Sequence, residues 1–451
     1  MSFPAYSSYR DSGVEWLGDV PSHWDALKVK GFAQFSGGGT PNREKPEYWN
    51  GDIPWVSPKD MKQEVITSSE EQITVEGLAS SATSKIEPGA VLLVVRSGIL
   101  RHTIPVAINE VTVALNQDMK ALQLNPSFCE PRFLFRWVQG LNDQLLLAWS
   151  KQGATVESIE HQYLAETLVP LPSLPEQTAI TAFLDRETAK IDALVEQQRR
   201  LIELLKEKRQ AVISHAVTKG LDPTVPMKDS GVEWLGEVPA HWAVKPLKYL
   251  AAFRSGGTPS KDNRDFWNGE VPWASAKDLK RDFLIDTVDH LTRTAIEQGA
   301  ATLVPAGSVL VLVRGMMLAR TFPVCEAGVP MTINQDLKAL LPASGVNGSY
   351  LAWLLRGTAT ETLNRLDEAG HGTKALRMEA WVSMELPMPA EDEQGVIVAH
   401  LERAVGAIDA LCDQATAATL LLQERRTALI SAAVTGKIDV RNSDLERAEA
   451  A

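Results

Sequence analysis

Two arginines each close a short apolar run and open a polar loop. The run VLLVVR ends at Arg96, and the run VLVLVR ends at Arg314. An arginine at the end of a buried strand can project to a phosphate or to the O6 and N7 atoms of guanine. A structural ion pair is the alternative, and the sequence does not decide between the two.

The loops that follow these arginines differ from one another. SGILRH at 97–102 corresponds to GMMLAR at 315–320, and NREK at 42–45 corresponds to SKDN at 260–263. Divergent polar loops on a shared scaffold are typical of two domains that recognise different targets. Drift of exposed loops explains any single difference equally well.

Motifs typical of nucleotide-binding enzymes are incomplete. GGGTP at 37–41 lacks the Gly-Lys-Ser/Thr of a P-loop and the spacing of a dinucleotide fingerprint, so we predict a tight turn. NPSF at 125–128 is similar to the Asn-Pro-Pro-Tyr/Phe box of adenine methyltransferases, but no glycine-rich cofactor motif accompanies it. PASG stands at the corresponding place, 342–345, and we interpret both as turns that lead into helices.

Acidic, histidine and cysteine residues indicate structure rather than catalysis. Four aspartates in turn-like contexts are interpreted as structural carboxylates: Asp60, Asp118, Asp278 and Asp336. The eight histidines show no metal-ligand spacing. Three cysteines are too far apart for a disulfide framework and are predicted to be core residues: Cys129, Cys325 and Cys412. We expect no catalytic residue and no metal site in this chain.

The composition is that of a globular protein. The chain has 451 residues, a length that is enough for two or three domains. Hydrophobic residues make up 44% of it and charged residues 23%. The start lacks a signal-peptide pattern and no apolar run approaches the roughly 18 residues needed to span a bilayer. We therefore expect a cytoplasmic protein with no membrane partner. The net charge of −12 argues against a nucleic-acid partner, unless local patches or a partner's surface supply the cations.

The chain is an internal duplication. DSGVEWLGDVPSHW at 11–24 returns as DSGVEWLGEVPAHW at 229–242. At the same offset, GGTPNREKPEYWNGDIPW from Gly38 returns as GGTPSKDNRDFWNGEVPW from Gly256, and LNQDMKAL from Leu115 returns in INQDLKAL. The two copies are therefore expected to share one fold.

Each copy is predicted to be a strand-rich mixed α/β domain. Residues 53–56 and 91–95 are expected to be buried strands, and a helix is expected to follow the turn at 125–126 and to run through 133–147. These domains occupy 25–174 and 243–390. Segment 1–24 precedes the first and is repeated at 229–242 within a linker, 221–242.

Two long helices are predicted at 175–220 and 391–437, followed by a polar tail at 438–451. The first has an apolar seam at heptad spacing: Ile180, Leu184, Ile191, Leu194, Leu201, Leu205 and Val212. The second repeats it at one constant offset: Ile397, Leu401, Ile408, Leu411, Ala418, Leu422 and Leu429. Such seams predict a coiled coil.

The two helices are expected to pack antiparallel. A helix of roughly 40 residues is about 60 Å long, whereas a domain of about 150 residues has a radius of gyration of about 15 Å. Parallel packing would require the second domain and its linker to bridge the whole helix length. The expected fold is therefore α+β, with pseudo-two-fold symmetry and one domain at each end of a helical pair.

This order of elements resembles the specificity subunit (HsdS) of type I restriction-modification enzymes. The shared features extend from Tyr9 to Asp439: DSGVEWLG twice, GGTP followed by YWNG or FWNG, IPW or VPW, LPEQ at 174–177, and VTGKID at 434–439. One departure is AEDEQ at 390–394, where the second helix lacks the LPEQ form.

The resemblance implies a non-catalytic subunit that recognises DNA. Each globular domain would be a target recognition domain that binds one half of a split sequence in double-stranded DNA. The helices would act as a spacer and as a docking surface for two methyltransferase subunits. Those subunits would hold S-adenosylmethionine and methylate adenine, and motor-nuclease subunits would join them with ATP and Mg; no cofactor is expected in this chain.

The residues predicted to contact DNA lie in loops of both copies. In the first copy they are Asn42, Arg43, Lys45, Lys59, Lys62, Arg96, Ser97, Arg101 and His102. In the second copy they are Lys261, Asn263, Arg264, Lys277, Lys280, Arg314, Arg320 and Lys374. The alternatives are the recognition subunit of a related system with a fused methylase and nuclease, and a structural scaffold whose duplicated domains bind proteins.

Overall fold

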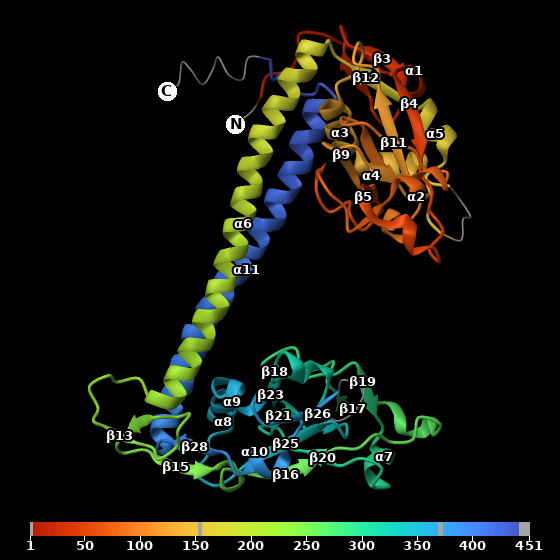
Figure 1. Cartoon of the computed structure of the whole chain (residues 1–451). Helices are drawn as coiled ribbons and strands as arrows, with labels where there is room; N and C mark the ends of the chain where they lie inside the picture. The colour runs from red at the N-terminus through yellow and green to blue at the C-terminus, as the bar shows by residue number, and fades with distance from the viewer. Residues whose placement is uncertain (1–2, 152–155, 369–372, 442–451) are drawn as a thin grey trace. The chain divides into compact units, whose positions relative to one another are not determined.

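The computed structural model in Figure 1 describes residues 3–151, 156–368 and 373–441. The chain divides into two compact units. Unit 1 comprises residues 1–198 with 417–451, and unit 2 comprises 199–416. Each unit holds one copy of the repeat and part of both long helices. Within the described residues, no helix combines the length and the apolar character that a membrane span needs.

A five-stranded mixed sheet forms the centre of unit 1. Its strand order is β4 (Ala33–Gly37), β11 (Met119–Leu124), β8 (Val91–Val94), β9 (Val106–Asn109) and β6 (Val65–Ile66). Only β6 pairs in parallel, with β9. Strand β8 packs Val91 and Leu93 into one core cluster and Leu92 and Val94 into another. Burial on both faces explains why this strand is a continuous apolar run.

Smaller elements surround this sheet. A second sheet has the order β10 (Ala114–Leu115), β5 (Trp49–Val56) and β7 (Glu71–Ile73), with β10 parallel to β5. Two antiparallel pairs are β1 (Tyr9–Asp11) with β2 (Asp19–Pro21), and β3 (Asp25–Lys28) with β12 (Leu168–Leu171). The helices are α1 (Val29–Phe32), η1 (Pro46–Tyr48), α2 (Val75–Ala79), η2 (Gly98–Arg101), α3 (Pro131–Gly140), α4 (Asn142–Trp149) and α5 (His161–Glu166).

The helix predicted through 133–147 is in fact two helices, α3 and α4. The turn at Asn125 is present, since the Phe128 amide donates to the Asn125 carbonyl at 3.0 Å. The helix begins only at Pro131, whose fixed φ suits the first helical position. It breaks at Leu141, where φ is −118°. The prediction of one continuous helix was therefore wrong, because the apolar pattern of the two helices does not mark this break.

Unit 2 repeats the architecture. Its five-stranded sheet has the order β16 (Ala251–Ser255), β25 (Leu337–Pro342), β21 (Val309–Leu312), β23 (Val324–Ala327) and β18 (Phe283–Leu284). A four-stranded sheet follows the order β19 (Asp289–Leu291), β17 (Trp267–Ala274), β24 (Met331–Ile333) and β20 (Leu303–Val304). The hairpin β13 (Met227–Asp229) with β14 (Glu237–Pro239) and the pair β15 (Ala243–Pro246) with β28 (Glu385–Met388) match those of unit 1.

Unit 2 also has a three-stranded sheet that the sequence pattern did not predict. It has the order β22 (Arg314–Gly315), β27 (Lys374–Leu376) and β26 (Leu366–Glu368). The helices of this unit are η3 (Leu247–Tyr249), η4 (Arg264–Phe266), α7 (Arg293–Glu297), η5 (Met316–Ala319), α8 (Gly348–Gly357), α9 (Ala359–Leu363) and α10 (Met378–Val382).

The two long helices are α6 (Leu174–Lys219) and α11 (Glu391–Val434). In unit 1, Ile180 and Leu184 of α6 share a core cluster with Ile430 and Val434 of α11. In unit 2, the other end of α6 shares a core cluster with the start of α11, through Ile213, Val217, Ile397 and Leu401. The helices therefore run antiparallel inside each unit, as expected, while the pseudo-two-fold arrangement of the whole chain stays a prediction.

The predicted apolar seam is correct at the helix ends and wrong in the middle. Leu194 and Leu201 of α6 are 44% and 43% exposed, and Leu411 of α11 is 50% exposed. Val195 and Ala415 are buried instead. An α-helix with 3.6 residues per turn drifts by about 20° per heptad from a strict seven-residue repeat. Over such long helices this drift moves the buried stripe onto neighbouring positions.

Each long helix ends against a copy of the DSGVEWLG segment. In unit 1, a Cβ added to Gly436 would lie 2.3 Å from Pro21 Cδ, and the Tyr9 hydroxyl donates to the Gly436 carbonyl at 3.0 Å. In unit 2, a Cβ on Gly220 would meet Trp242 at 3.3 Å. Of the predicted tail at 438–451, residues 442–451 lie outside the described residues, and the Asp439 amide donates to the Pro4 carbonyl at 2.7 Å.

Candidate nucleic-acid interface

The GGTP segment lies closely against residues 115–116 in unit 1 and against residues 333–334 in unit 2. A Cβ on Gly38 would lie 2.0 Å from the Asn116 carbonyl oxygen, and a Cβ on Gly256 would lie 2.1 Å from that of Ile333. The Gly39 amide donates to the Leu115 carbonyl at 2.9 Å. This amide is therefore unavailable to a phosphate. The predicted tight turn is wrong, because residues 38–41 form neither a hydrogen-bonded turn nor a bend and are held instead by residues 115–116.

Two tryptophans support this segment in each copy. In unit 1, Trp55 Nε1 donates to the Gly39 carbonyl at 2.9 Å. The Trp49 ring packs edge-to-face against the Trp55 ring, with 5.2 Å between the ring centres. Trp267 and Trp273 form the same pair at 5.2 Å in unit 2. The GGTP, WNG and PW motifs therefore build a shared scaffold. The side chains available to vary are those of the surrounding loops.

Arg43 is engaged by its own domain. Its guanidinium lies 4.2 Å from the centre of the Trp49 ring and donates twice to Glu71, once at 2.9 Å. Hydrogen bonding to Arg43 lowers the pKa of Glu71, so this carboxylate is ionised at neutral pH. Arg43 would have to leave Glu71 to bind DNA, and its role as a contact stays a prediction.

The second copy uses different partners at the same place. The exposed Lys261 replaces Arg43. Asp289, at the position of Glu71, is instead paired with Lys277 at 2.6 Å. Asn263 caps helix η4 by accepting from the Asp265 amide at 3.2 Å, and Arg264 is exposed. The same scaffold therefore presents a different pattern of charge in each unit.

Two other predicted contacts of this loop have local roles. Asn42 Oδ1 accepts from the Glu44 amide at 2.9 Å, which fixes a turn. Lys45 Nζ donates to the Tyr48 hydroxyl at 3.1 Å, and this hydrogen bond raises the pKa of Lys45. Both side chains remain exposed.

The loop after β8 combines one paired and one unpaired arginine. Ser97 caps η2 by accepting from the Ile99 amide at 3.4 Å. Arg101 is paired with Glu157 at 2.5 Å. Arg96 and His102 are exposed, and neither side chain has an ion pair with another described residue. Sequence reasoning missed Glu157, because it lies far along the chain from Arg101.

The corresponding loop of unit 2 is presented by the unexpected small sheet. Strand β22 pairs Arg314 with Ala375 and Gly315 with Lys374, so two segments distant in the sequence meet at one sheet edge. Met316 is 76% exposed directly after this strand, and Arg320 is exposed at the end of η5. The structure thus places Arg314 and Lys374 on neighbouring strands of one sheet, in register with Ala375 and Gly315, which the sequence did not indicate.

In each unit, two of the lysines predicted to contact DNA flank a turn that an aspartate stabilises. Asp60 Oδ2 accepts from the Ser57 amide at 2.8 Å and Oδ1 from the Glu70 amide at 2.7 Å. Asp278 makes the equivalent bonds to Ser275 and Val288. The interpretation of these aspartates as structural is confirmed. Of the lysines beside them, Lys277 is paired as described above, and three are exposed: Lys59, Lys62 and Lys280.

Two buried cysteines and the aspartates of the Asn-Gln-Asp turns have structural surroundings. Within the described residues, no cluster of three or more His, Cys, Asp or Glu could hold a metal ion. Burial raises the pKa of Cys129 to about 12 and that of Cys325 to about 12, so both thiols are protonated and nearly inert at neutral pH. Asp118 and Asp336 lie in Asn-Gln-Asp turns, where their amides donate to Asn116 and Asn334.

A carboxylate at the start of each long helix holds the repeated HW dipeptide. In unit 1, buried Glu176 accepts from Trp24 Nε1 at 3.1 Å and lies 3.0 Å from His23 Nε2. In unit 2, Glu393 accepts from Trp242 Nε1 at 3.0 Å. AEDEQ therefore keeps the glutamate that holds this dipeptide, despite its departure from the LPEQ form.

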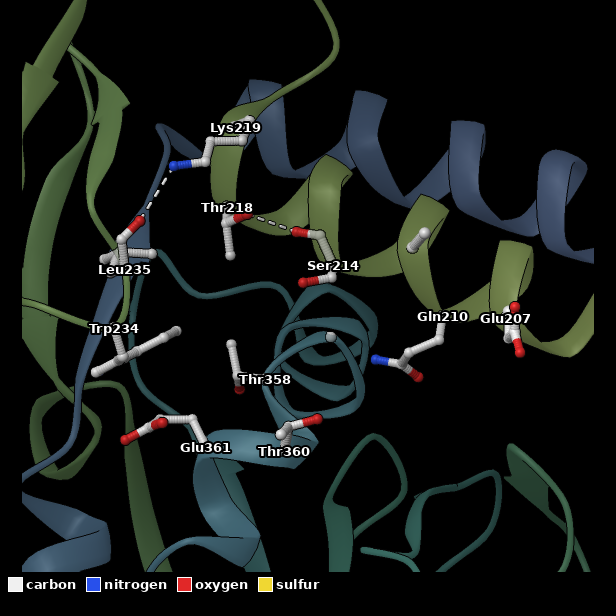
Figure 2. A pocket seen from close by; sticks show the side chains of 12 residues that line it. Glu207, Gln210, Ser214, Thr218, Lys219, Trp234, Leu235, Thr358, Thr360 and Glu361 are labelled. Atoms are coloured by element: carbon white, nitrogen blue, oxygen red, sulfur yellow. Dashed lines mark hydrogen bonds between the residues drawn. The ribbon is translucent and has the colours of Figure 1, made fainter.

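A groove lies beside the helix pair of each unit. In unit 2 it lies between the last turns of α6, the α8–α9 corner and Trp234 (Figure 2). Its lining includes Gln210, Ser214, Thr218, Trp234, Thr358 and Glu361. Unit 1 has a groove at the matching place, between α11 and the α3–α4 corner, lined by Gly140, Asn142, Gln144, Thr427 and Ser431. One surface feature is therefore built twice.

The "Type I restriction modification DNA specificity domain" family model matches residues 21–204 and 239–413. Each match covers one copy of the repeat and continues into the long helix that follows. The chain belongs to this family. The resemblance noted from the motifs is thereby confirmed.

Curated relatives in this family are specificity subunits. The type I restriction enzyme EcoR124I/EcoR124II specificity subunit of Escherichia coli is 36% identical over 201 residues, 44% of this chain and 48% of that protein. The MjaIX specificity subunit of Methanocaldococcus jannaschii is 25% identical over 288 residues, 62% of this chain and 64% of that protein. The matches span about half of the first relative and less than two thirds of the second.

Solved structures share the fold. A chain from a study of complex assembly and conformational transition of the type I R-M system superposes with a TM-score of 0.71 at 17% identity, covering 93% of this chain and 99% of that chain. The HsdS subunit of Thermoanaerobacter tengcongensis gives a TM-score of 0.50 at 16% identity, with 93% and 98% covered. At such low identity the likeness shows the fold alone.

Proposed function

We propose that this chain is the DNA sequence-recognition subunit of a type I restriction-modification complex. It recognises a bipartite target, one half with each unit, and directs adenine methylation and cleavage by partner subunits. The observation that carries the proposal is one scaffold built twice with different loops. Scaffold residues match between the copies, whereas Arg101 and His102 are replaced by Ala319 and Arg320.

Exposed cations in the loops are the proposed DNA contacts. Those without an ion pair among the described residues are Lys59, Lys62, Arg96, Lys261, Arg264, Lys280, Arg314 and Arg320. A contact of this kind positions the protein when it meets a phosphate and specifies sequence when it meets a base edge. With a net charge of −12, the remaining positive surface comes from partner subunits.

The paired grooves are the proposed docking sites for two methyltransferase subunits. Two matching grooves fit two copies of one partner, because Glu207, Ser214 and Gly357 of one lining recur as Glu424, Ser431 and Gly140 of the other. S-adenosylmethionine is bound by these partners, and ATP and Mg by motor-nuclease subunits. The chain itself performs no catalysis under this proposal.

Methylome sequencing tests the proposal directly. In cells that express the chain with its methyltransferase subunits, we expect adenine methylation at one bipartite sequence with a fixed gap. The control is the same strain without this chain, in which that methylation is absent. An assembled complex that adds no methylated sequence would contradict the proposal.

A binding measurement separates recognition from catalysis. The isolated chain is expected not to bind S-adenosylmethionine in a calorimetric titration. Saturable binding would favour an enzyme over a recognition subunit.

A further inference from the structure

In unit 1, one arginine joins the globular domain to both long helices. Arg426 of α11 donates from Nη2 to Glu64 Oε1 at 2.8 Å. The same guanidinium donates from Nε to Asp192 Oδ1 of α6 at 2.9 Å. Glu64 directly precedes β6, the edge strand of the five-stranded sheet. The arginine therefore links the edge of this sheet to the helix pair.

We call this arrangement a node: one arginine of a long helix between a carboxylate at the sheet edge and a carboxylate of the other long helix. Unit 2 contains the same node with the two helices exchanged. Here Arg209 belongs to α6, and its Nη2 donates to Asp282 Oδ2 at 2.7 Å. Its Nε donates to Asp409 Oδ1 of α11 at 2.9 Å. Asp282 directly precedes β18, which is the matching edge strand. Identical geometry from exchanged helices makes a chance surface ion pair an inadequate explanation.

A second, buried arginine holds each carboxylate from the domain side. In unit 1, Arg136 of α3 lies 3.1 Å from Glu64. In unit 2, Arg356 of α8 donates to the Asp282 carbonyl at 2.6 Å and lies 3.3 Å from its carboxylate. Each carboxylate thus lies between an arginine of the globular domain and an arginine of a long helix. The arginine of the long helix is the one to substitute, because it connects the domain to the helix pair.

The two node arginines are largely buried. The side chains of Arg426 and Arg209 are 23% and 26% exposed. Partly buried arginine–carboxylate hydrogen bonds are stronger and more directional than exposed pairs, and each guanidinium here bonds two carboxylates through two of its nitrogens. Each node can therefore resist rotation of its domain about the contact.

We propose that Arg209 and Arg426 are positioning residues that fix the angle of each globular domain on its helix pair, and so fix the gap between the two DNA half-sites. This inference rests on the proposed function. A rotation of about 10° moves a surface on the order of 20 Å away by about 3.5 Å, given the size of such a domain. That displacement is close to one base-pair step of 3.4 Å.

The test uses the assembled complex with Arg426→Gln or Arg209→Gln. Matched controls are Arg425→Gln and Lys208→Gln, neighbouring exposed cations on the same helices. Methylome sequencing should show unchanged half-sites, with methylation at gaps one base pair shorter or longer rising by roughly tenfold, the change that loss of a charged hydrogen bond can give. The controls should keep the wild-type gap.

Hydrogen exchange on the purified chain provides a second measurement if a variant complex assembles poorly. Arg426→Gln should speed exchange at residues 64–66 and leave 282–284 unchanged, and Arg209→Gln should do the reverse. Variants that keep the wild-type gap and the wild-type exchange would overturn the inference, as would uniform loss of methylation with no change of gap. A wild-type complex that methylates no bipartite sequence would instead contradict the proposed function.

Discussion

At the scale of single residues, the predicted arginine contacts fall into two kinds. Arg43 and Arg101 already pair with Glu71 and Glu157, whereas Arg96 and Arg320 have no ion pair among the described residues. All four arginines are exposed. An exposed ion pair contributes only about 0–1 kcal/mol. A paired arginine can therefore exchange its carboxylate for DNA at small cost, so pairing in the free protein does not remove these candidates.

Arg101→Ala and Arg320→Ala are expected to act on separate half-sites. Each removes one cation from the loop of one unit only, so methylome sequencing should show one relaxed or lost half-site and an intact partner half-site. Loss of a base contact costs about 1–3 kcal/mol of discrimination. Equal loss of binding across unrelated sequences would instead assign these arginines to phosphate contacts or to structure.

Glu64→Gln should destabilise unit 1 in a pH-dependent way. Burial opposes ionisation of Glu64, but Gln139, Arg136 and Arg426 outweigh it and hold the pKa of the carboxyl below its usual value. A depressed folded-state pKa gives stability that is present above the unfolded pKa, about 4.3, and is lost as the pH falls through the folded pKa.

The difference between wild type and Glu64→Gln in urea midpoint should therefore be large at pH 7 and shrink below about pH 4. The control is Glu70→Gln, an exposed carboxylate without an ion pair among the described residues. A difference that grows in acid would contradict this account.

At the scale of elements, close helix crossings hold each domain against a long helix. A Cβ on Gly140 of α3 would lie 2.8 Å from the Ser431 amide nitrogen of α11. A Cβ on Gly357 of α8 would lie 2.5 Å from Val217 Cγ2 of α6. The position is glycine in both units because a side chain would separate the two helices.

Gly140→Ala should therefore lower the stability of unit 1 by about 1–3 kcal/mol, since its Cβ meets backbone rather than a flexible side chain. Gly406→Ala is the matched control, because this exposed helical glycine has nothing within 4 Å of its Cβ position. The control should gain about 0.5–1 kcal/mol from helix propensity. Thermal unfolding measures both, and destabilisation of equal size would contradict the crossing argument.

The two grooves should act independently in partner binding. Ser214→Trp and Ser431→Trp each fill one groove at a half-buried helix position. Native mass spectrometry should show one methyltransferase subunit lost with either variant and both lost with the double variant. If the double variant still binds two subunits, the docking surface lies elsewhere on the chain.

At the scale of the whole molecule, α6 and α11 each continue through both units. This continuity predicts that helix length sets the gap between half-sites. Four residues inserted into α6 after Gln198, matched by four in α11 after Thr416, lengthen the helix pair by about 6 Å. The gap should then grow by about two base pairs at 3.4 Å each, with the half-sites unchanged in the methylome. An unchanged gap would contradict the spacer role.

The sequence by itself determined the repeated architecture. The duplication, the strands at 53–56 and 91–95, the two long helices and their antiparallel packing follow from periodicity, repeated motifs and length. These features are local or repeated, so the pattern along the chain encodes them. The Asp60 turn was likewise predictable, because its partners Ser57 and Glu70 are close in sequence. The turn predicted for GGTP is absent, because this segment lies against residues 115–116, which are distant in the sequence.

Only the tertiary structure decided which charged side chains pair and where the helices bury their middle turns. Arg426 meets Glu64, and Arg209 meets Asp282, although both pairs are far apart in the sequence. The exposure of Leu194 follows from helix drift and from the packing of the partner helix. Such contacts depend on how distant segments are placed in three dimensions, and a local pattern of residue types does not predict that placement.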